Sequence, residues 1–494
     1  MSEIKDLQPN GIWKNFYSLT QIPRPSKKEA KVVAFMKQWG EEHGFETIVD
    51  DCVAPGLGNV IMRKPATPGM ENRKGVILQA HLDMVPQKNA DKVHDFENDP
   101  IGTHIENGWV KANGTTLGSD DGMGVAAAMA VLESTDIAHG PIEALFTIDE
   151  ETGMTGANLL KSGMLNGDIL MNMDSETEGE LYVGCAGGVD TIGTFTPKFE
   201  AVPAGMVAYR LFVKGLKGGH SGMDINLGRA NANKVLNAMM LMAAEKYGLR
   251  MACIDGGSLR NAIPREATAI VVVPAGKEAQ FKAYAAEFEA ITKEQFAGIE
   301  PELAILCEPA EMPKQVIDVK TQDNFFRAIA QYPNGVIAMS ADFEGTTETS
   351  SNLATIKMED GKIITACLTR SLVDAAKDKL AEQIRKNLTD NGAEAYSTGD
   401  YPGWKPNINS PILHTMKEVY KAKFGADAKI MVVHAGLECG ILGSKYPHWD
   451  MVSFGPTLVH PHSPDEALFI ESVPKFWDFI VETLKNIPEK ETLA

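Results

Sequence analysis

Four apolar runs in this chain end on side chains that can bind a metal ion, and this pattern constrains the fold more than any other. The runs and the residues that follow them are 76–80 before His81-Leu82-Asp83, 142–148 before Asp149-Glu150-Glu151, 169–173 before Asp174, and 451–454 ahead of His460 and His462. Short runs of β-forming residues closed by polar residues are typical of buried strands. Ligand sites of open α/β sheets lie beyond the carboxyl ends of the strands. We therefore predict an α/β sheet with metal-binding side chains at its strand ends.

The length and composition indicate two domains and exclude several classes of partner. At 494 residues the chain exceeds the usual size of a single hydrophobic core. Its formal net charge of -19 disfavours nucleic acid and anionic membranes, because both bind basic surfaces. The six cysteines form no Cys-x-x-Cys pair, which argues against a disulfide framework or a thiolate metal site. There is no apolar signal segment and no run of roughly 18 apolar residues, so we expect a cytoplasmic protein.

The order of the predicted elements indicates that one domain is inserted into another. Predicted strands alternate with helices as far as Asp174, as in a parallel α/β layer. From about Gly187 the predicted strand–helix units carry no ligands at their strand ends, and the α/β pattern resumes after Tyr401. We predict a discontinuous catalytic domain, residues 1–186 and 400–494, interrupted by an α+β lid domain at residues 187–399.

His81 and Asp83 are two positions apart, so their side chains point the same way on a strand. A metal-bound imidazole donates its other N–H to a carboxylate, which fixes the tautomer and strengthens the ligand. The pair is therefore typical of a metal ligand with its supporting acid. The alternative is a strand end of this composition that binds no metal.

Two acidic segments could supply further ligands. Asp120 and Asp121 precede a predicted helix, where an aspartate is usually a cap but could also bridge two cations. The three acids 149–151 would repel one another strongly without a cation, unless they form a solvated turn. In such a row one acid can bind a metal while its neighbour transfers a proton. Spacing alone does not choose between His460 and His462.

Taken together, these segments offer two histidines and three carboxylates without a thiolate. Such ligands suit zinc, manganese or cobalt. Three carboxylates and a bridging hydroxide would offset the four positive charges of two divalent ions. We therefore predict a two-metal hydrolase with a spare glutamate as the general base.

The same motifs make the chain resemble the co-catalytic zinc peptidases, the family that includes carnosinases, acetylornithine deacetylase and tripeptidase T. The motifs that carry the resemblance are His81-Leu82-Asp83, Asp120-Asp121-Gly122, Asp149-Glu150-Glu151-Thr152-Gly153, Asp174, Gly218-Gly219-His220-Ser221-Gly222, Arg260-Asn261-Ala262-Ile263-Pro264, His434-Ala435-Gly436-Leu437-Glu438 and the C-terminal histidine segment. They follow the family's order and extend over nearly the full length. The resemblance implies a mixed, largely parallel sheet between helices, interrupted by a lid domain.

The resemblance also implies a role for each residue of the metal centre. Asp120 would bridge two zinc ions, His81 and Asp174 would hold one, and Glu151 and His462 would hold the other. Glu150 would be the general base, and Asp83 would support His81. The family places the histidine four residues before a glutamate, which selects His462 over His460. Asp121 remains an alternative to Asp120, since both are acids. Cobalt or manganese could replace zinc.

The resemblance further implies the substrate and its contacts. The likeness is greatest to family members that hydrolyse Xaa-His dipeptides, including β-Ala-His. The substrate-binding residues would be His220, Asn261, Arg370, Gly436 and Glu438, with Arg370 near the substrate carboxylate. We expect a homodimer formed through the lid. The first alternative is an N-acyl amino acid deacylase with the same metals, and the second is a non-catalytic metal-binding protein.

Overall fold

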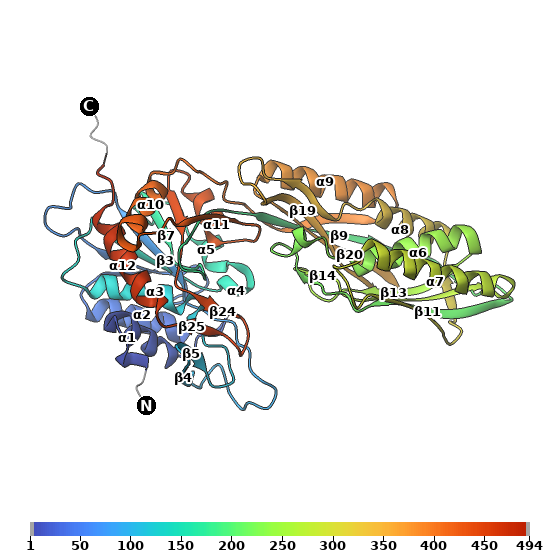
Figure 1. Ribbon diagram of the computed structural model, residues 1–494, viewed down its shortest axis with the longest axis horizontal. Helices are drawn as coiled ribbons and strands as arrows, with labels where there is room; N and C mark the ends of the chain where they lie inside the picture. The colour runs from blue at the N-terminus through green and yellow to red at the C-terminus, as the bar shows by residue number, and fades with distance from the viewer. Residues whose placement is uncertain (1–3, 491–494) are drawn as a thin grey trace. The chain divides into compact units, whose positions relative to one another are not determined.

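The computed structural model describes residues 4–490, which form two compact units. The first unit comprises the chain up to Gly184, Pro406–Val432 and the chain from Leu437 onward. The second unit comprises Cys185–Lys405 and Val433–Gly436. Figure 1 shows each unit as a sheet packed with helices. Among the described residues, no helix combines the length and apolar character needed to cross a membrane.

An eight-stranded mixed sheet forms the centre of the first unit. Its strands, in spatial order, are β1 (Glu46–Val49), β2 (Val60–Lys64), β6 (Ile142–Thr147), β3 (Val76–His81), β7 (Ile169–Asn172), β23 (Asp450–Ser453), β8 (Glu180–Cys185) and β22 (Lys429–Val433). Strands β6, β3, β7 and β23 run parallel to one another, whereas β2 is antiparallel to β6 and β8 to β23. The four parallel strands are almost wholly buried, as their continuous apolar runs predict. Their carboxyl ends therefore meet at one edge.

Helices cover this sheet. They are α1 (Asn10–Thr20), α2 (Ala30–Glu42), α3 (Ser119–Glu133), the short α4 (Glu150–Gly153) and α5 (Thr155–Leu159), α10 (Pro411–Phe424), α11 (Glu438–Lys445) and α12 (Ser472–Lys485). Helix α3 packs between α1 and β3, and every residue from Ser119 to Leu132 is buried. Its alanines and glycines permit this close approach on all sides. The start of α3 is consequently fixed beside the end of β3.

A small four-stranded sheet completes the first unit. It contains β24 (Leu458–Val459), β25 (Ala467–Phe469), β5 (Trp109–Ala112) and β4 (Thr103–Glu106), in that order. Strands β24 and β25 are antiparallel, and the loop between them carries His460 and His462.

The second unit is a nine-stranded antiparallel sheet with helices. The strand path is β16 (Ala304–Pro309), β11 (Met206–Lys214), β15 (Ala267–Pro274), β13 (Arg250–Gly256), β19 (Thr347–Glu359), β20 (Lys362–Ser371), β9 (Gly187–Phe195) and β21 (Glu394–Tyr401), with β18 (Gly335–Met339) paired to β19. Helices α6 (Ala232–Tyr247), α7 (Glu278–Gln295), α8 (Val319–Gln331) and α9 (Asp374–Asp390) pack on it around one apolar core. Two short pairs, β10 (Phe199–Ala201) with β17 (Gln315–Ile317) and β12 (Gly219–His220) with β14 (Ala262–Ile263), complete it.

The division into units includes a feature that the sequence did not indicate. The predicted ranges 1–186, 187–399 and 400–494 place Val433–Gly436 with the C-terminal part of the catalytic domain, but the structure groups this segment with the second unit. Contacts within the second unit explain the difference. The Ala186 N–H donates to the Val433 carbonyl at 3.1 Å, and His434 Nε2 lies 2.7 Å from Ser350 Oγ.

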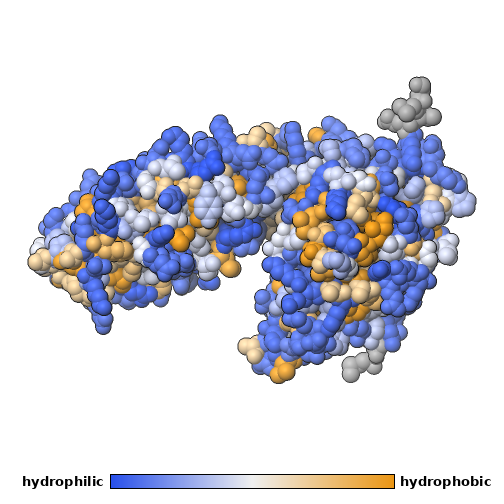
Figure 2. All heavy atoms as spheres, turned by 180° about the vertical axis from the view of Figure 1, so that it is seen from behind, coloured by the Kyte–Doolittle hydropathy of each residue, from blue (hydrophilic) through white to orange (hydrophobic). Residues whose placement is uncertain are grey.

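One face of the molecule is largely hydrophilic. Figure 2 shows hydrophilic residues over most of the face that it presents, with smaller apolar areas between them.

Candidate metal centre

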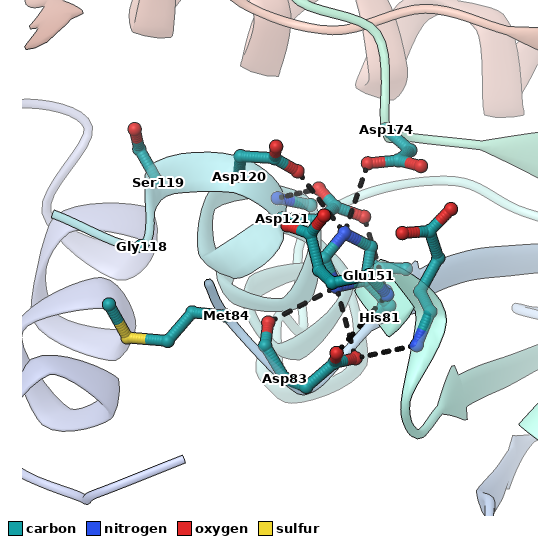
Figure 3. A network of polar contacts seen from close by, with 12 residues as sticks. His81, Asp83, Met84, Gly118, Ser119, Asp120, Asp121, Glu151 and Asp174 are labelled. Carbon is teal, nitrogen blue, oxygen red and sulfur yellow. Dashed lines mark hydrogen bonds and ion pairs between the residues drawn. The ribbon is translucent and has the colours of Figure 1, made fainter. Parts of the chain in front are cut away.

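Three neighbouring parallel strands and one helix bring the predicted ligands together. His81 is the last residue of β3, and Asp174 follows the end of β7. Glu150 and Glu151 begin α4 directly after β6. Asp120 lies in the first turn of the buried helix α3. Figure 3 shows the labelled members of this group around the end of β3. The strand-end pattern of the sequence thus corresponds to one cluster in space.

The two carboxylate oxygens of Asp120 face different partners. Asp120 Oδ1 lies 3.1 Å from His81 Nε2, which is itself 3.3 Å from Asp174 Oδ1. Asp120 Oδ2 lies 3.0 Å from His462 Nε2, which is 2.9 Å from Glu151 Oε2. Asp120 therefore joins a His81–Asp174 pair to a His462–Glu151 pair.

These donors fit a divalent cation chemically. Asp120, Glu151 and His462 have ligand atoms within 4.8 Å of one another, and so do His81, Asp121 and Asp174. The Oε1 atom of Glu151 is buried and has no hydrogen-bond partner among residues 4–490. A buried carboxylate oxygen without a donor is costly unless something positive compensates it. The site can therefore hold metal ions.

Asp121 has different contacts from Asp120. Its Oδ2 accepts the main-chain N–H of His81 at 3.2 Å, and its Oδ1 accepts that of Gly124 at 3.1 Å. Burial, together with the nearby Asp174, raises the pKa of Asp121 well above its usual value. Asp121 also has an oxygen near His81 and Asp174, but its hydrogen bonds tie the start of α3 to the end of β3. Of these two aspartates, Asp120 is the one that contacts both His81 and His462.

Asp83 supports both His81 and the acidic segment that begins α4. Its Oδ1 lies 3.4 Å from His81 Nδ1 and accepts the N–H of Glu150 at 3.0 Å. Its Oδ2 accepts the N–H of Glu151 at 3.3 Å. Burial opposes ionisation of Asp83, but the contact with His81 and these N–H groups keep its pKa below the usual value.

Glu150 combines burial with a crowd of neighbouring charges. Burial raises its pKa well above the usual value; His81 opposes the shift, and Asp174 and Glu151 reinforce it. A carboxyl group in such surroundings holds a proton more readily than one in water.

Three further residues organise the centre, and the sequence alone did not reveal them. Glu466 is buried and accepts the N–H groups of Leu117, Gly118, Ser119 and Asp120 at 2.8, 3.1, 2.8 and 3.4 Å. The guanidinium of Arg24, also buried, donates to the carbonyls of Leu82 and Asp83 at 2.8 and 3.2 Å. Glu29 accepts the N–H of Asp149 at 3.1 Å. All three act on main-chain groups. Of the three, the sequence pointed only to Glu466, because the family pattern places a glutamate four residues after the histidine.

Glu438, predicted to contact substrate, is completely buried in the first unit. Its Oε2 accepts hydrogen bonds from Gln79 Nε2 and Thr147 Oγ1, both at 2.7 Å, and its Oε1 has no hydrogen-bond partner within the part of the chain that the structure describes. Burial raises the pKa of Glu438 to about 7. These contacts fix the start of α11 to β3 and β6.

The other predicted substrate residues belong to the second unit. Arg370 is 4% exposed, and its guanidinium reaches two neutral partners, Tyr401 OH at 2.8 Å and Ser221 Oγ at 3.4 Å. The carbonyl of Asn261 accepts the N–H of Ser221 at 2.8 Å, and a Cβ at Gly436 would lie 3.0 Å from the Tyr401 ring. The Tyr401 side chain thus lies beside both Arg370 and Gly436, and Arg370 also contacts Ser221, the neighbour of His220.

The His220 side chain is held by its own loop. Its Nδ1 accepts the N–H groups of Gly222 and Met223, both at 3.1 Å. These bonds require Nδ1 to be unprotonated in this geometry, so the neutral ring carries its proton on Nε2.

Comparison with known proteins identifies the family. The model of peptidase family M20/M25/M40 matches residues 77–486, which include His81, Asp120, Glu151, Asp174 and His462. The chain belongs to this family. It is 46% identical over 490 residues to the cytosol non-specific dipeptidase of Escherichia coli, covering 99% of this chain and 100% of that protein.

Solved structures of this family share the fold. The aminoacylhistidine dipeptidase of Vibrio alginolyticus is 46% identical and superimposes with a TM-score of 0.90 over 99% of both chains. The aminopeptidase PepT of Bacillus cereus, at 16% identity and a TM-score of 0.56, shares the fold alone. The predicted α/β architecture with its mixed sheet is therefore confirmed, and so is the prediction of a peptide-bond hydrolase.

Proposed function

We propose that this peptidase hydrolyses dipeptides, with a preference for Xaa-His substrates that include β-Ala-His, and that it uses two divalent metal ions. The observation that carries the proposal is the position of Asp120, whose two oxygens face a His81–Asp174 pair and a His462–Glu151 pair. Support for the substrate comes from the full-length similarity to two dipeptidases, one named for aminoacylhistidine and one described as non-specific.

The proposed metal is zinc, with cobalt or manganese as substitutes. His81 and Asp174 would hold one ion, Glu151 and His462 would hold the other, and Asp120 would serve both. The nitrogen and oxygen donors, without a cysteine, suit these metals. When bound, such ions lower the pKa of a coordinated water and polarise the peptide carbonyl.

In the proposed reaction Glu150 transfers the proton. Its carboxylate accepts a proton from the attacking water and returns it to the nitrogen of the leaving amino acid. Asp83 holds the His81 imidazole in one tautomer, and through two N–H groups it also holds the segment that bears Glu150. Glu150 is therefore the catalytic acid and base, and Asp83 positions its surroundings.

The substrate contacts are proposed from the family motifs. His220 donates from Nε2 to the scissile carbonyl oxygen, which is consistent with the two N–H groups that occupy its Nδ1. Arg370 binds the substrate carboxylate, and its buried guanidinium contacts the neutral hydroxyls of Tyr401 and Ser221. Asn261 and Gly436 line the same site. Glu438 has a supporting role: its buried hydrogen bonds hold in place the segment that follows Gly436.

We further propose roles for the two units, an oligomeric state and a cellular location. The first unit is the catalytic domain, and the second is a lid that supplies His220 and forms a homodimer. The protein acts in the cytoplasm on small peptides and binds neither nucleic acid nor membrane. The acidic net charge of -19 and the relative named for the cytosol support this assignment.

The experiment that tests the substrate class is a comparison of Gly-His with N-acetyl-histidine, using zinc-loaded protein. A dipeptidase releases histidine much faster from Gly-His, and the preference for histidine is then measured against Gly-Leu and Gly-Gly. Cleavage of the acetylated compound alone would identify a deacylase with the same metal ligands.

A further inference from the structure

Glu29 lies beside the acidic segment 149–151, although it is far from that segment in sequence. It is only 2% exposed and immediately precedes helix α2. A single oxygen of Glu29, Oε1, accepts the N–H of Asp149 at 3.1 Å and the N–H of Lys27 at 2.8 Å. Glu29 thus connects the N-terminal segment directly to the residues that begin α4.

The main-chain N–H groups of the acidic segment are all bound by carboxylates. The N–H of Asp149 donates to Glu29, and those of Glu150 and Glu151 donate to Asp83 at 3.0 and 3.3 Å. Asp149 itself has a left-handed backbone with φ of 51°, a conformation that is uncommon for residues other than glycine and in which these hydrogen bonds hold it. The turn that aims Glu150 is therefore fixed from outside the segment.

The loop that carries Glu29 is itself tied to the end of β3. The Ser26 hydroxyl donates to Asp83 Oδ2 at 2.8 Å, and the Ser26 N–H donates to the Met84 carbonyl at 3.2 Å. Met84 in turn donates its N–H to the Arg24 carbonyl at 3.1 Å. Glu29 and Asp83 consequently form one connected support beneath the acidic turn.

Glu29, Asp83 and Asp149 bring three carboxylates within 4.8 Å of one another in the protein interior. Each is accounted for by donors of the chain: N–H groups for Glu29 and Asp83, and the hydroxyls of Thr152 and Thr155 for Asp149. This group is therefore a structural network and needs no cation. Its role is to hold the main chain of the turn at residues 149–151.

We infer that Glu29 is a positioning residue for Glu150, acting through the N–H of Asp149. The inference rests on the proposed function, in which Glu150 transfers the proton. Without the Glu29 acceptor, the Asp149 N–H is buried without a partner and the turn is free to rearrange. Glu150 then moves away from the reacting water while the substrate contacts of the second unit are unchanged. The effect therefore falls on kcat rather than on KM.

Three substitutions at Glu29 distinguish the effect of its acceptor oxygen from the effect of its negative charge. Glu29→Gln keeps an oxygen at the same reach and removes the charge. Glu29→Asp keeps the charge and withdraws the oxygen by one methylene, and Glu29→Ala removes both. We expect kcat within about threefold of the original for Gln, and losses of about 10- to 100-fold for Asp and Ala, the range typical of groups that orient a metal site. KM should stay within twofold when the variants are compared at saturating zinc.

Glu143→Ala is the matched control. Glu143 is buried at the amino-terminal half of β6, the strand that leads into the acidic turn, and it accepts the N–H groups of Asn166 and Gly167 at 2.7 and 2.8 Å. Its loss should lower stability without lowering kcat. Hydrogen exchange of the metal-free variants adds a local measurement: Glu29→Ala should speed exchange at residues 149–151, and Glu143→Ala should not.

The outcomes distinguish this inference from the proposed function. Glu150→Ala is measured in the same series, and normal turnover in that variant would refute the proposed function. If Glu150→Ala is inactive but Glu29→Asp and Glu29→Ala retain kcat within twofold, the inference about Glu29 is wrong. It is also wrong if Glu29→Gln is as impaired as Glu29→Ala, since charge rather than position would then matter. Should Glu29→Ala fail to fold, the Asp and Gln pair alone decides.

Discussion

Asp120 and His462 are 342 positions apart in the sequence, yet the Asp120 Oδ2 atom lies 3.0 Å from His462 Nε2. Their contact joins the start of α3 to the loop between β24 and β25. Because the other oxygen of Asp120 faces His81, one carboxylate relates the two halves of the metal centre. Predictions about metal binding follow directly from this arrangement.

Asp120→Ala should abolish the retention of both metal ions, whereas His462→Ala should weaken only one. The reason is that Asp120 contacts both histidine pairs and His462 only one of them. Metal content after dialysis at a fixed free zinc concentration measures the difference. The control is His460→Ala, a histidine in the same loop outside the described cluster, which should retain both ions. Equal losses in the Asp120 and His462 variants would argue against a bridge.

Glu150→Ala should retain both ions and lose about 100- to 10,000-fold in kcat, the contribution typical of general acid–base catalysis. Glu151→Ala, at the next position, should instead lose metal, because its carboxylate faces His462 at 2.9 Å. Steady-state hydrolysis of Gly-His and metal analysis of the same samples test the pair. If Glu150→Ala lost metal as readily as Glu151→Ala, the division of roles between these neighbours would be wrong.

Glu466→Gln should weaken metal binding about 10- to 100-fold and lower the free energy of unfolding by roughly 1–3 kcal/mol. The amide nitrogen of glutamine would face N–H groups that now donate to the carboxylate, so the turn before Asp120 would lose acceptors. A zinc competition assay with a chromogenic chelator measures the affinity, and urea unfolding measures stability.

Glu300→Gln provides the control for Glu466. Glu300 is buried in the second unit and accepts the N–H groups of Lys217 and Ala230 at 2.8 and 3.0 Å. We expect this variant to lose stability and keep its zinc affinity. A similar loss of affinity in both variants would show that the Glu466 effect is not local.

His434 should make the protein less stable as the pH falls below about 6.5. Burial, with Arg370 and His220 nearby, lowers the pKa of His434 to about 3 in the folded protein. The unfolded chain, with an ordinary value near 6.5, binds the proton more readily. The contribution of neutral His434 to the free energy of unfolding is thus complete above pH 6.5. It is lost as the pH falls toward 3, by about 1.4 kcal/mol per pH unit at most.

His434→Gln removes the titrating ring and should flatten this slope. Urea unfolding of both proteins between pH 4.5 and 7.5 gives the comparison, and other acids contribute equally to the two. The same slope in the variant would assign the pH dependence to groups other than His434.

The sequence allowed prediction of those parts of the site that depend on local pattern. His81, Asp174 and the acids 149–151 each follow a buried apolar run, and parallel strands bring such ends to one edge of a sheet whatever their distance in sequence. The insertion of a second unit was also visible, because the ligand-bearing pattern stops near residue 187 and resumes in the C-terminal segment. The particular spatial order of the strands was not.

The remaining features depend on contacts between distant segments. Glu29 and Glu466 bind main-chain N–H groups 120 and up to 349 positions away, and a backbone donor leaves no signature in the sequence. Glu438 has the same acidic side chain as a metal ligand, and only its fully buried contacts with Gln79 and Thr147 reveal a supporting position. The choice between Asp120 and Asp121 likewise required the direction of each carboxylate.

The measurement that tests the central claim most directly is a zinc titration of metal-free protein, with Gly-His hydrolysis and bound metal followed together. The account predicts that activity rises with bound zinc, that binding saturates at two ions per chain, and that chelation abolishes turnover. Asp120→Ala should remain inactive throughout. Full activity in the chelated protein, or saturation without any hydrolysis of dipeptides, would contradict a two-metal dipeptidase.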